Sequence, residues 1–233
     1  MCGRFVGYRP VEVLREHFPI DRTAAEVTAN YNVAPSQEVL AVIRREDTNW
    51  LERLHWGLVP FWAKDTAIGN RLINALAETV AAKPSFRHAF RNRRCLILAD
   101  GFYEWTGPKG SKQPVFITLP GEAPFAFAGL WESWRPADDA HAAYRSCTII
   151  TTAASRSVQP IHHRMPAVLK PEAYAAWLDP RTSDTRTLAD LLANRIQTVF
   201  TSRPVSTTVN ATRNNSPDLI DPLFDQPPGA SED

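Results

Sequence analysis

Most apolar residues of the chain lie in short runs separated by polar or Pro/Gly-containing turns, which is the spacing typical of strands. The runs that predict strands lie at residues 39–43, 51–58, 95–99, 101–105, 115–119, 125–134 and 144–152. Apolar residues at helical spacing predict helices at 11–18, 171–178 and 184–195. Because the strands do not alternate regularly with helices, the pattern favours an α+β fold with a mixed, barrel-like β-sheet core flanked by short helices.

Other segments are predicted from their turn-forming residues. Residues 31–37 should form a rigid proline loop, and Pro84 can open a helix within residues 83–94. Residues 153–160 predict a short helix or turn, and residues 205–210 predict a returning strand. No repeat or linker interrupts residues 1–222, so we expect one domain there and a disordered polar tail at 223–233.

Two segments place polar side chains among apolar ones. Alternation along residues 101–105 puts Tyr103 and Trp105 on one face and Phe102 and Glu104 on the other. An aromatic setting disfavours the charged form of a carboxylate, as a proton donor or acceptor working near neutral pH requires. The residues alone equally allow a solvent-facing glutamate. Residues 72–79 are too apolar for a surface loop, so the polar side chains of Asn74 and Glu78 need partners.

Composition narrows the class of protein. The formal net charge of +1 carries no global signature of nucleic-acid binding, so such a surface must come from local clustering. No apolar run approaches the roughly 20 residues of a membrane span and no signal-peptide layout is present, so we expect a cytoplasmic protein. The three cysteines show no CxxC spacing, which argues against a disulfide scaffold or a zinc site. Cys95 and Cys147 lie in apolar runs and are predicted to be buried.

The first residues, Met1-Cys2-Gly3-Arg4-Phe5, carry a distinctive chemistry. If Met1 is removed, Cys2 offers an α-amine and a thiol on adjacent carbons. An α-amine has a pKa near ~8, so roughly a tenth of it is unprotonated at neutral pH and can attack an aldehyde. The thiol can then close the resulting imine into a five-membered thiazolidine. The alternative is that a small residue occupies position 2 by chance.

Three further clusters each allow two interpretations. Trp56, Phe61 and Trp62 crowd beside Gly and Pro and form either a stacking platform for bases or part of the core. Residues 83–94 hold five cationic residues and one histidine, which form either a phosphate-binding surface or a solvated helix face. The loop 161–166 contains His162, His163 and Arg164, which are either plain surface residues or a proton-transfer and phosphate-holding loop.

Six sequence motifs, taken in chain order, resemble those of the SRAP family, the SOS response-associated peptidase-like proteins. The resemblance runs from Cys2 to about Pro222. The motifs are Met1-Cys2-Gly3-Arg4-Phe5, Tyr31-Asn32-Val33-Ala34-Pro35, Trp56-Gly57-Leu58-Val59-Pro60, Ile73-Asn74-Ala75, Gly101-Phe102-Tyr103-Glu104-Trp105 and Ile161-His162-His163-Arg164-Met165-Pro166.

The resemblance implies a monomeric protein of the DNA damage response that recognises abasic sites in single-stranded DNA, including junctions with duplex. It implies that Cys2 crosslinks to the ring-opened sugar as a thiazolidine, with possible lyase side activity and autoproteolytic removal of Met1. Asn74 would orient the cysteine, and Glu104 would relay protons at its amine. His162 would protonate the sugar ring oxygen as the ring opens. No metal or other cofactor is implied.

The resemblance also implies a set of DNA contacts. Arg4 and Arg164 would hold phosphates beside the lesion, and Trp62 would stack on a base. The loop from Asn32 to Pro35 would wedge against DNA where a duplex begins.

One departure from the family pattern concerns these contacts. The family motif usually reads Asn-Ala-Arg, whereas Leu76 replaces the arginine here. The expectation is either weaker DNA affinity or a substitute contact from Arg71 or Arg87.

Three rival functions fit parts of the same sequence. The Met-Cys-Gly start also suits an N-terminal-nucleophile amidohydrolase in which Cys2 attacks an amide. The aromatic and basic clusters suit a module that binds single-stranded DNA without a covalent bond. A zinc site formed by Cys2 and His162 lacks the usual ligand spacing.

Overall fold

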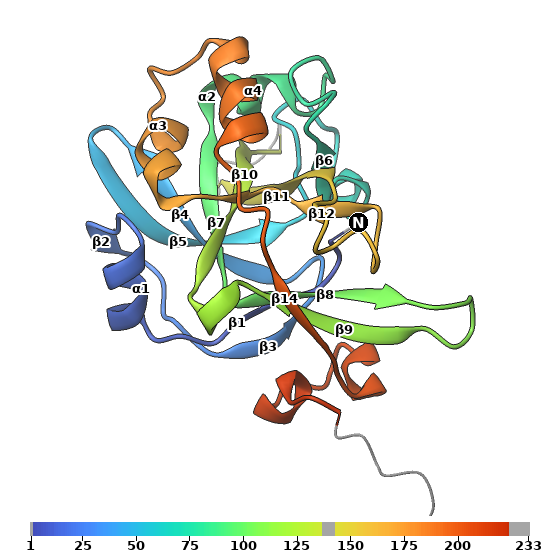
Figure 1. Ribbon diagram of the computed structural model, residues 1–233. Helices are drawn as coiled ribbons and strands as arrows, with labels where there is room; N and C mark the ends of the chain where they lie inside the picture. Colours follow the sequence, from blue (N-terminus) through green and yellow to red (C-terminus); the bar gives the residue numbers. More distant parts are fainter. Residues whose placement is uncertain (1, 137–142, 224–233) are drawn as a thin grey trace, which may run out of the picture.

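The computed structural model describes residues 2–136 and 143–223. Within them the chain is dominated by strands, with a few short helices at the periphery (Figure 1). This is the α+β class that the apolar pattern predicts. The tail prediction for 223–233 falls, beyond Leu223, outside the described residues.

A closed ring of five strands forms the centre of the molecule. The ring runs β11 (Tyr144–Ala153), β10 (Phe125–Trp134), β7 (Arg94–Ala99), β4 (Glu38–Arg45) and β5 (Thr48–Trp56). It closes because the end of β5 pairs in parallel with β11, with His55 opposite Ser146 and Trp56 opposite Cys147. The neighbouring pairs around the rest of the ring are antiparallel. The predicted barrel-like core is confirmed.

Four short strands extend the ring at its edges. β2 (Arg22–Thr23) adds to β5, and β13 (Val168–Leu169) adds to β10. β6 (Asn74–Leu76) and β12 (Arg164–Pro166) both pair with β11. Two segments far apart in sequence, each carrying predicted site residues, therefore meet on one strand.

A second sheet of five strands packs below the ring in Figure 1. Its order is β14 (Thr201–Pro204), β9 (Gln113–Thr118), β8 (Gly101–Thr106), β1 (Phe5–Gly7) and β3 (Asn30–Val33). Aromatic rings join the two sheets: Phe5 and Phe102 lie with ring centroids 5.5 Å and 6.3 Å from that of Phe127 in β10. Such edge-to-face contacts add to the stabilisation from burying apolar area.

The alternation predicted for residues 101–105 is confirmed by the packing. Phe102 belongs to the large core cluster, which Cys2 also joins. Tyr103 lies in a smaller cluster on the opposite face with Val6, Phe116 and residues of the C-terminal segment, and Trp105 packs against it. Glu104 therefore points to the side of the sheet that carries Phe102 and Cys2.

The helices are short. The α-helices are α1 (Val11–His17), α2 (Arg87–Asn92), α3 (Tyr174–Leu178) and α4 (Thr185–Asn194). The 3-10 helices are η1 (Thr66–Arg71), η2 (Pro120–Glu122), η3 (Pro171–Ala173), η4 (Thr207–Asn210) and η5 (Pro217–Ile220). α2, α3 and α4 lie above the ring in Figure 1, and α1 lies at the lower left. None of the helices in the described part of the chain is long and apolar enough to cross a membrane.

Two predicted elements differ in place or kind. The helix of the basic stretch begins at Arg87 rather than near Pro84, after a turn closed by the Phe86 N–H donating to the Lys83 carbonyl. The strand expected at 205–210 is wrong: β14 ends at Pro204, and the Ser206 hydroxyl accepts from the Thr208 N–H to start η4. A local side-chain cap thus prevails over the alternating apolar pattern.

Candidate functional site

Cys2 lies just before β1 and is completely buried in the large core cluster. Burial raises the pKa of its thiol far above the ordinary value, and the negative charge of Glu104 raises it further. The thiol is therefore protonated at neutral pH. A protonated thiol is a poor nucleophile, so in this setting Cys2 reacts through sulfur only when a base takes its proton.

Asn74 holds the backbone at Cys2. Its side-chain Nδ2 donates to the Cys2 carbonyl oxygen at 2.8 Å. β6 carries Asn74 to this place because it pairs in parallel with β11, where Asn74 lies opposite Ile149. The Asn74 Oδ1 is buried and has no hydrogen-bond partner among the described residues. A buried acceptor without a donor is costly, so this oxygen is suited to a group that arrives with a ligand.

Glu104 reaches the same place from the second sheet. Its strand, β8, runs antiparallel to β1 with Phe5 opposite Phe102, and the Tyr103 N–H donates to the Arg4 carbonyl at 2.9 Å. Continuing this register brings Glu104 beside the residues preceding β1. Glu104 is 4% exposed, so its carboxylate is largely desolvated where its charge raises the pKa of the Cys2 thiol.

His162 is oriented by the backbone of its own loop. Its Nδ1 lies 3.0 Å from the Arg164 backbone nitrogen and 2.9 Å from the Arg164 carbonyl oxygen. Its ring stacks on that of His163 with centroids 4.4 Å apart. The contacts of Nδ1 with the Arg164 backbone thus fix the orientation of the imidazole ring.

Arg164, at the start of β12, is engaged within the protein. Its Nη1 and Nη2 donate to the two carboxylate oxygens of Glu78 at 2.7 Å and 3.0 Å, and Nη2 also donates to the Thr151 carbonyl at 2.7 Å. These hydrogen bonds lower the pKa of Glu78. Glu78 thus has the partner that it was expected to need, and that partner is Arg164. The Glu78 side chain is half exposed rather than buried. Contact of Arg164 with phosphate stays a prediction.

Arg4 and Asn32 are both tied to the C-terminal segment. Arg4 Nη1 donates to the Asn32 Oδ1 at 2.6 Å and to the Val209 carbonyl at 2.8 Å, and burial lowers the pKa of this guanidinium. Asn32 is 1% exposed, and its Nδ2 donates to the carbonyls of Val209, Ala211 and Asn214. The Asn32 side chain therefore does not reach the surface, whereas Pro35 is half-buried and the adjacent Ser36 is exposed.

The aromatic cluster of Trp56, Phe61 and Trp62 is partly buried and partly exposed, and base stacking stays a prediction. Trp56 is a core residue, 1% exposed, whose Nε1 donates to the Ile73 carbonyl. Phe61 and Trp62 are 54% and 49% exposed. Arg71 and Arg87, the suggested substitutes for an arginine at position 76, are both exposed.

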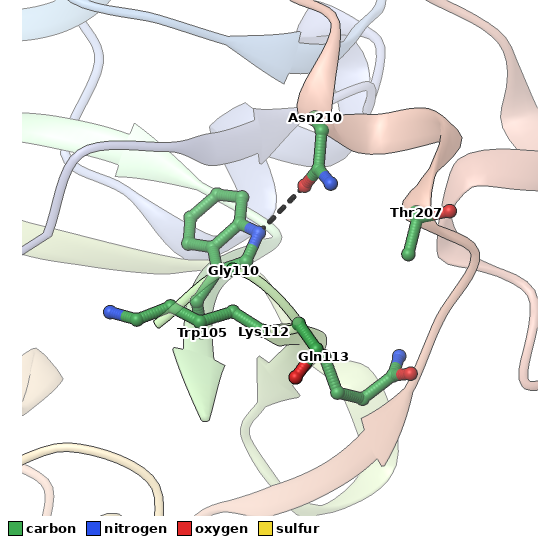
Figure 2. A pocket seen from close by; sticks show the side chains of 7 residues that line it. Trp105, Gly110, Lys112, Gln113, Thr207 and Asn210 are labelled. Carbon is green, nitrogen blue, oxygen red and sulfur yellow. Dashed lines mark hydrogen bonds between the residues drawn. The ribbon is translucent and has the colours of Figure 1, made fainter. Parts of the chain in front are cut away.

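Trp105 is a further residue of interest, to which the sequence assigned only a sheet face. Its ring lies under the Arg4 guanidinium, 5.7 Å from the ring centroid, and its Nε1 donates to the Asn210 Oδ1 at 2.7 Å. It borders an open hollow of about 580 Å³. Figure 2 shows Trp105 between the β8–β9 hairpin and the segment that carries Thr207 and Asn210. The hollow is lined by Trp105, Gly110, Ser111, Lys112, Gln113, Thr207 and Asn210. The Gly- and Lys-rich stretch 107–112 is the signal that could have indicated a surface loop here.

Acidic, histidine and cysteine side chains in residues 2–136 and 143–223 do not gather in groups of three that could hold a metal ion. Cys2, Asn74, Glu104 and His162 offer a thiol, an amide, a carboxylate and an imidazole, respectively.

Comparison with known proteins identifies one family model and several relatives. A family model described as SOS response associated peptidase (SRAP) matches residues 1–212. The abasic site processing protein YoqW of Bacillus subtilis (strain 168) is 43% identical, over 95% of this chain and 99% of its own. The abasic site processing protein HMCES of Gallus gallus is 33% identical, over 83% of this chain and 66% of its own.

Solved structures share the fold. A protein from Bacteroides thetaiotaomicron superposes with a TM-score of 0.81 at 23% identity, covering 96% of this chain and all of the other. A phage-related protein from Bordetella bronchiseptica superposes with a TM-score of 0.68 at 29% identity, covering 88% of this chain and 94% of the other.

Proposed function

The chain belongs to the SOS response associated peptidase (SRAP) family, and on that premise we propose that it processes abasic sites in DNA by forming a covalent bond through Cys2. Relatives at 42–43% identity carry the name abasic site processing protein. The observation that carries the proposal for this chain is the placement of Cys2, whose carbonyl is bound by Asn74 and whose thiol lies within the field of Glu104.

The order of bond formation follows from the ionisation of the two nucleophiles. Once Met1 is removed, the Cys2 α-amine attacks the aldehyde carbon of the ring-opened sugar, and loss of water leaves an imine. The thiol, whose raised pKa keeps it protonated, adds second. Its sulfur bonds to the imine carbon and its proton passes to the imine nitrogen, so the sum is aldehyde plus aminothiol giving thiazolidine plus water.

The neighbouring side chains divide the proton transfers and the positioning in these steps. Glu104 accepts a proton at the Cys2 amine and returns one as water leaves, and it is the base beside the thiol during ring closure. His162 donates a proton to the sugar ring oxygen as the ring opens. Asn74 positions Cys2 through its carbonyl, and the Asn74 Oδ1 accepts from the nitrogen of the adduct. The imine that precedes ring closure is also the intermediate from which strand cleavage by β-elimination would proceed.

DNA contacts are assigned to one exposed aromatic ring, one loop tip and two arginines. Trp62 stacks on a base of the single strand. Pro35 and Ser36 form the tip that meets a duplex end, with Asn32 supporting the loop from inside through its three carbonyl contacts. Arg4 and Arg164 contact phosphates beside the lesion, Arg164 by exchanging its contact with Glu78.

Intact mass spectrometry tests the proposal. The untagged protein is weighed before and after incubation with a single-stranded oligonucleotide that carries one abasic site. The expected result is a chain lacking Met1 that gains the mass of the oligonucleotide less one water, and no stable adduct from Cys2→Ala. A folded, trimmed wild-type chain that gains no mass would contradict covalent processing and favour non-covalent DNA binding or amide hydrolysis.

A further inference from the structure

Apart from the Cys2 site, the protein carries a cationic face on α2, which consists of Arg87, His88 and Arg91. These side chains, with Ala81, Ala82 and Asn92, line an open hollow of about 410 Å³. Arg87 and Arg91 are one helical turn apart, so they project from the same side of the helix. The described contacts of this face do not include Cys2, Asn74 or Glu104, so it is separate from the site above.

The arginines of the basic stretch fall into two groups. Arg94 is 3% exposed and its guanidinium donates to the carbonyls of Trp177, Phe90, Arg91 and Asp179. Arg93 forms an ion pair with the buried carboxylate of Glu132. Both have structural roles.

Arg87 and Arg91, by contrast, are exposed. Among the residues that the structure describes, neither has a carboxylate within salt-bridge distance. Their positive charges are consequently uncompensated. A pair of unpaired guanidinium groups beside a hollow is suited to bind an anion bidentately.

His88 completes this face in a fixed orientation. Its Nδ1 lies 2.8 Å from the Glu132 Oε1, and because a carboxylate can only accept, Nδ1 carries the hydrogen. This leaves Nε2 for a ligand. The charge of Glu132, whose side chain is 2% exposed, is balanced by Arg93, so it does not cancel the charges of Arg87 and Arg91.

Exposed aromatic rings adjoin the cations. The Phe61 ring lies 5.0 Å from the His88 ring, edge to face, and Trp62 follows it in the chain. Both are about half exposed. Large exposed rings beside uncompensated arginines are typical of surfaces that bind single-stranded nucleic acid, where rings stack on bases and cations hold phosphates. A site for a free anion would not need the rings.

We propose that Arg87, His88 and Arg91 bind phosphates of the DNA strand outside the abasic nucleotide, next to bases that stack on Phe61 and Trp62. The inference rests on the proposed function and extends it with a second contact region. It also supplies phosphate contacts in a chain where Leu76 stands at the family's arginine position. Inorganic phosphate presents the same chemistry, so the test must separate the two ligands.

The test measures non-covalent binding at several salt concentrations. The oligonucleotide is single-stranded, about 20 nucleotides long so that it extends past a single binding site, and carries an unreactive tetrahydrofuran analogue of the abasic sugar. Wild type is compared with Arg87→Gln/Arg91→Gln and with the control Arg15→Gln/Arg44→Gln, which removes the same charge from α1 and β4. Each lost phosphate contact should reduce the magnitude of the slope of log K against log salt concentration by about 0.7, so the double variant should show a reduction of about 1.4.

Three outcomes are informative. A reduced slope and weaker binding in Arg87→Gln/Arg91→Gln, with the control equal to wild type and equal melting temperatures, supports the site. A slope equal to that of wild type overturns it. Thermal stabilisation by inorganic phosphate that the double variant loses, while its DNA slope stays unchanged, would make this a small-anion site and also overturn it.

The intact-mass experiment separates failure of this inference from failure of the proposed function. If the α2 surface binds the oligonucleotide but no covalent adduct forms with an abasic site, only the Cys2 chemistry is contradicted. Crosslinking without the slope change contradicts the α2 site alone.

Discussion

The guanidinium of Arg164 is held by both carboxylate oxygens of Glu78, with Nη1 2.7 Å from Oε1 and Nη2 3.0 Å from Oε2. The pair joins residues 86 positions apart and lies at Thr151 of β11, the residue with which β6 and β12 both pair from opposite edges. The same arginine fixes His162 through its backbone. A phosphate that binds Arg164 through both Nη groups must displace Glu78.

Replacing Glu78 with glutamine should therefore tighten DNA binding. The change removes a negative charge near the expected phosphate and releases the Arg164 charge. Because half-exposed pairs contribute up to about 1 kcal/mol, we expect an affinity gain of about two- to fivefold. Fluorescence anisotropy with the tetrahydrofuran oligonucleotide measures it, with Glu16→Gln on α1 as control. Weaker binding by Glu78→Gln would instead mean that Glu78 positions Arg164 for the phosphate.

The same pair should make stability depend on pH. Hydrogen bonds from Arg164 lower the pKa of Glu78 in the folded state below its unfolded value. The stabilisation is therefore fully present above the unfolded pKa and is lost as the pH falls through the folded pKa. Urea unfolding should show wild type more stable than Glu78→Gln at neutral pH, with the difference shrinking as the pH falls through the lowered folded-state pKa of Glu78. A difference that persists in acid would assign it to packing rather than to charge.

Cys2→Ala should separate the two covalent steps. The variant keeps the α-amine, so we expect an imine that borohydride reduces to a stable adduct, but no adduct without the reductant. A tag that retains Met1 should remove both products, because the amine is then no longer on residue 2. Denaturing electrophoresis with labelled oligonucleotide reads both. A full yield of unreduced adduct from Cys2→Ala would exclude thiazolidine formation.

Glu104→Gln should slow crosslinking by roughly 10²- to 10⁴-fold, the usual contribution of a positioned proton donor or acceptor. Since the charge of Glu104 raises the pKa of Cys2, the variant should also have a lower Cys2 pKa and faster alkylation at a given pH. Peptide mapping measures how fast Cys2 is alkylated, with the buried Cys95 and Cys147 as internal references. An unchanged crosslinking rate in a folded variant would give Glu104 a structural role only.

Elements set by neighbours in sequence were predictable. The helix at 11–18 and the strands of the ring follow from apolar spacing, and the structure places them within a few residues. The two faces of residues 101–105 also follow from strand geometry. Where local chemistry competes with the pattern, as at Ser206, spacing alone selected the wrong element.

The roles of individual charged residues were not predictable in the same way. The basic stretch reads as one cluster, yet Arg93 pairs with Glu132 and Arg94 with backbone carbonyls, while Arg87 and Arg91 stay exposed. The DNA contact that the family motif implies for Asn32 stays a prediction, and its amide binds the C-terminal segment, which the motif did not indicate.

By itself the sequence determined the aminothiol chemistry available at Cys2, the strand-rich class and the side of β8 on which Glu104 lies, because these depend on bonded neighbours and on the period of the backbone. Only the tertiary structure decided that Asn74 binds the Cys2 carbonyl, that Arg164 is engaged by Glu78 and that β5 closes the ring on β11. The physical reason is that a buried or paired polar group is stable only with a partner, and here the partners lie 72 and 86 residues away and meet only when the ring closes.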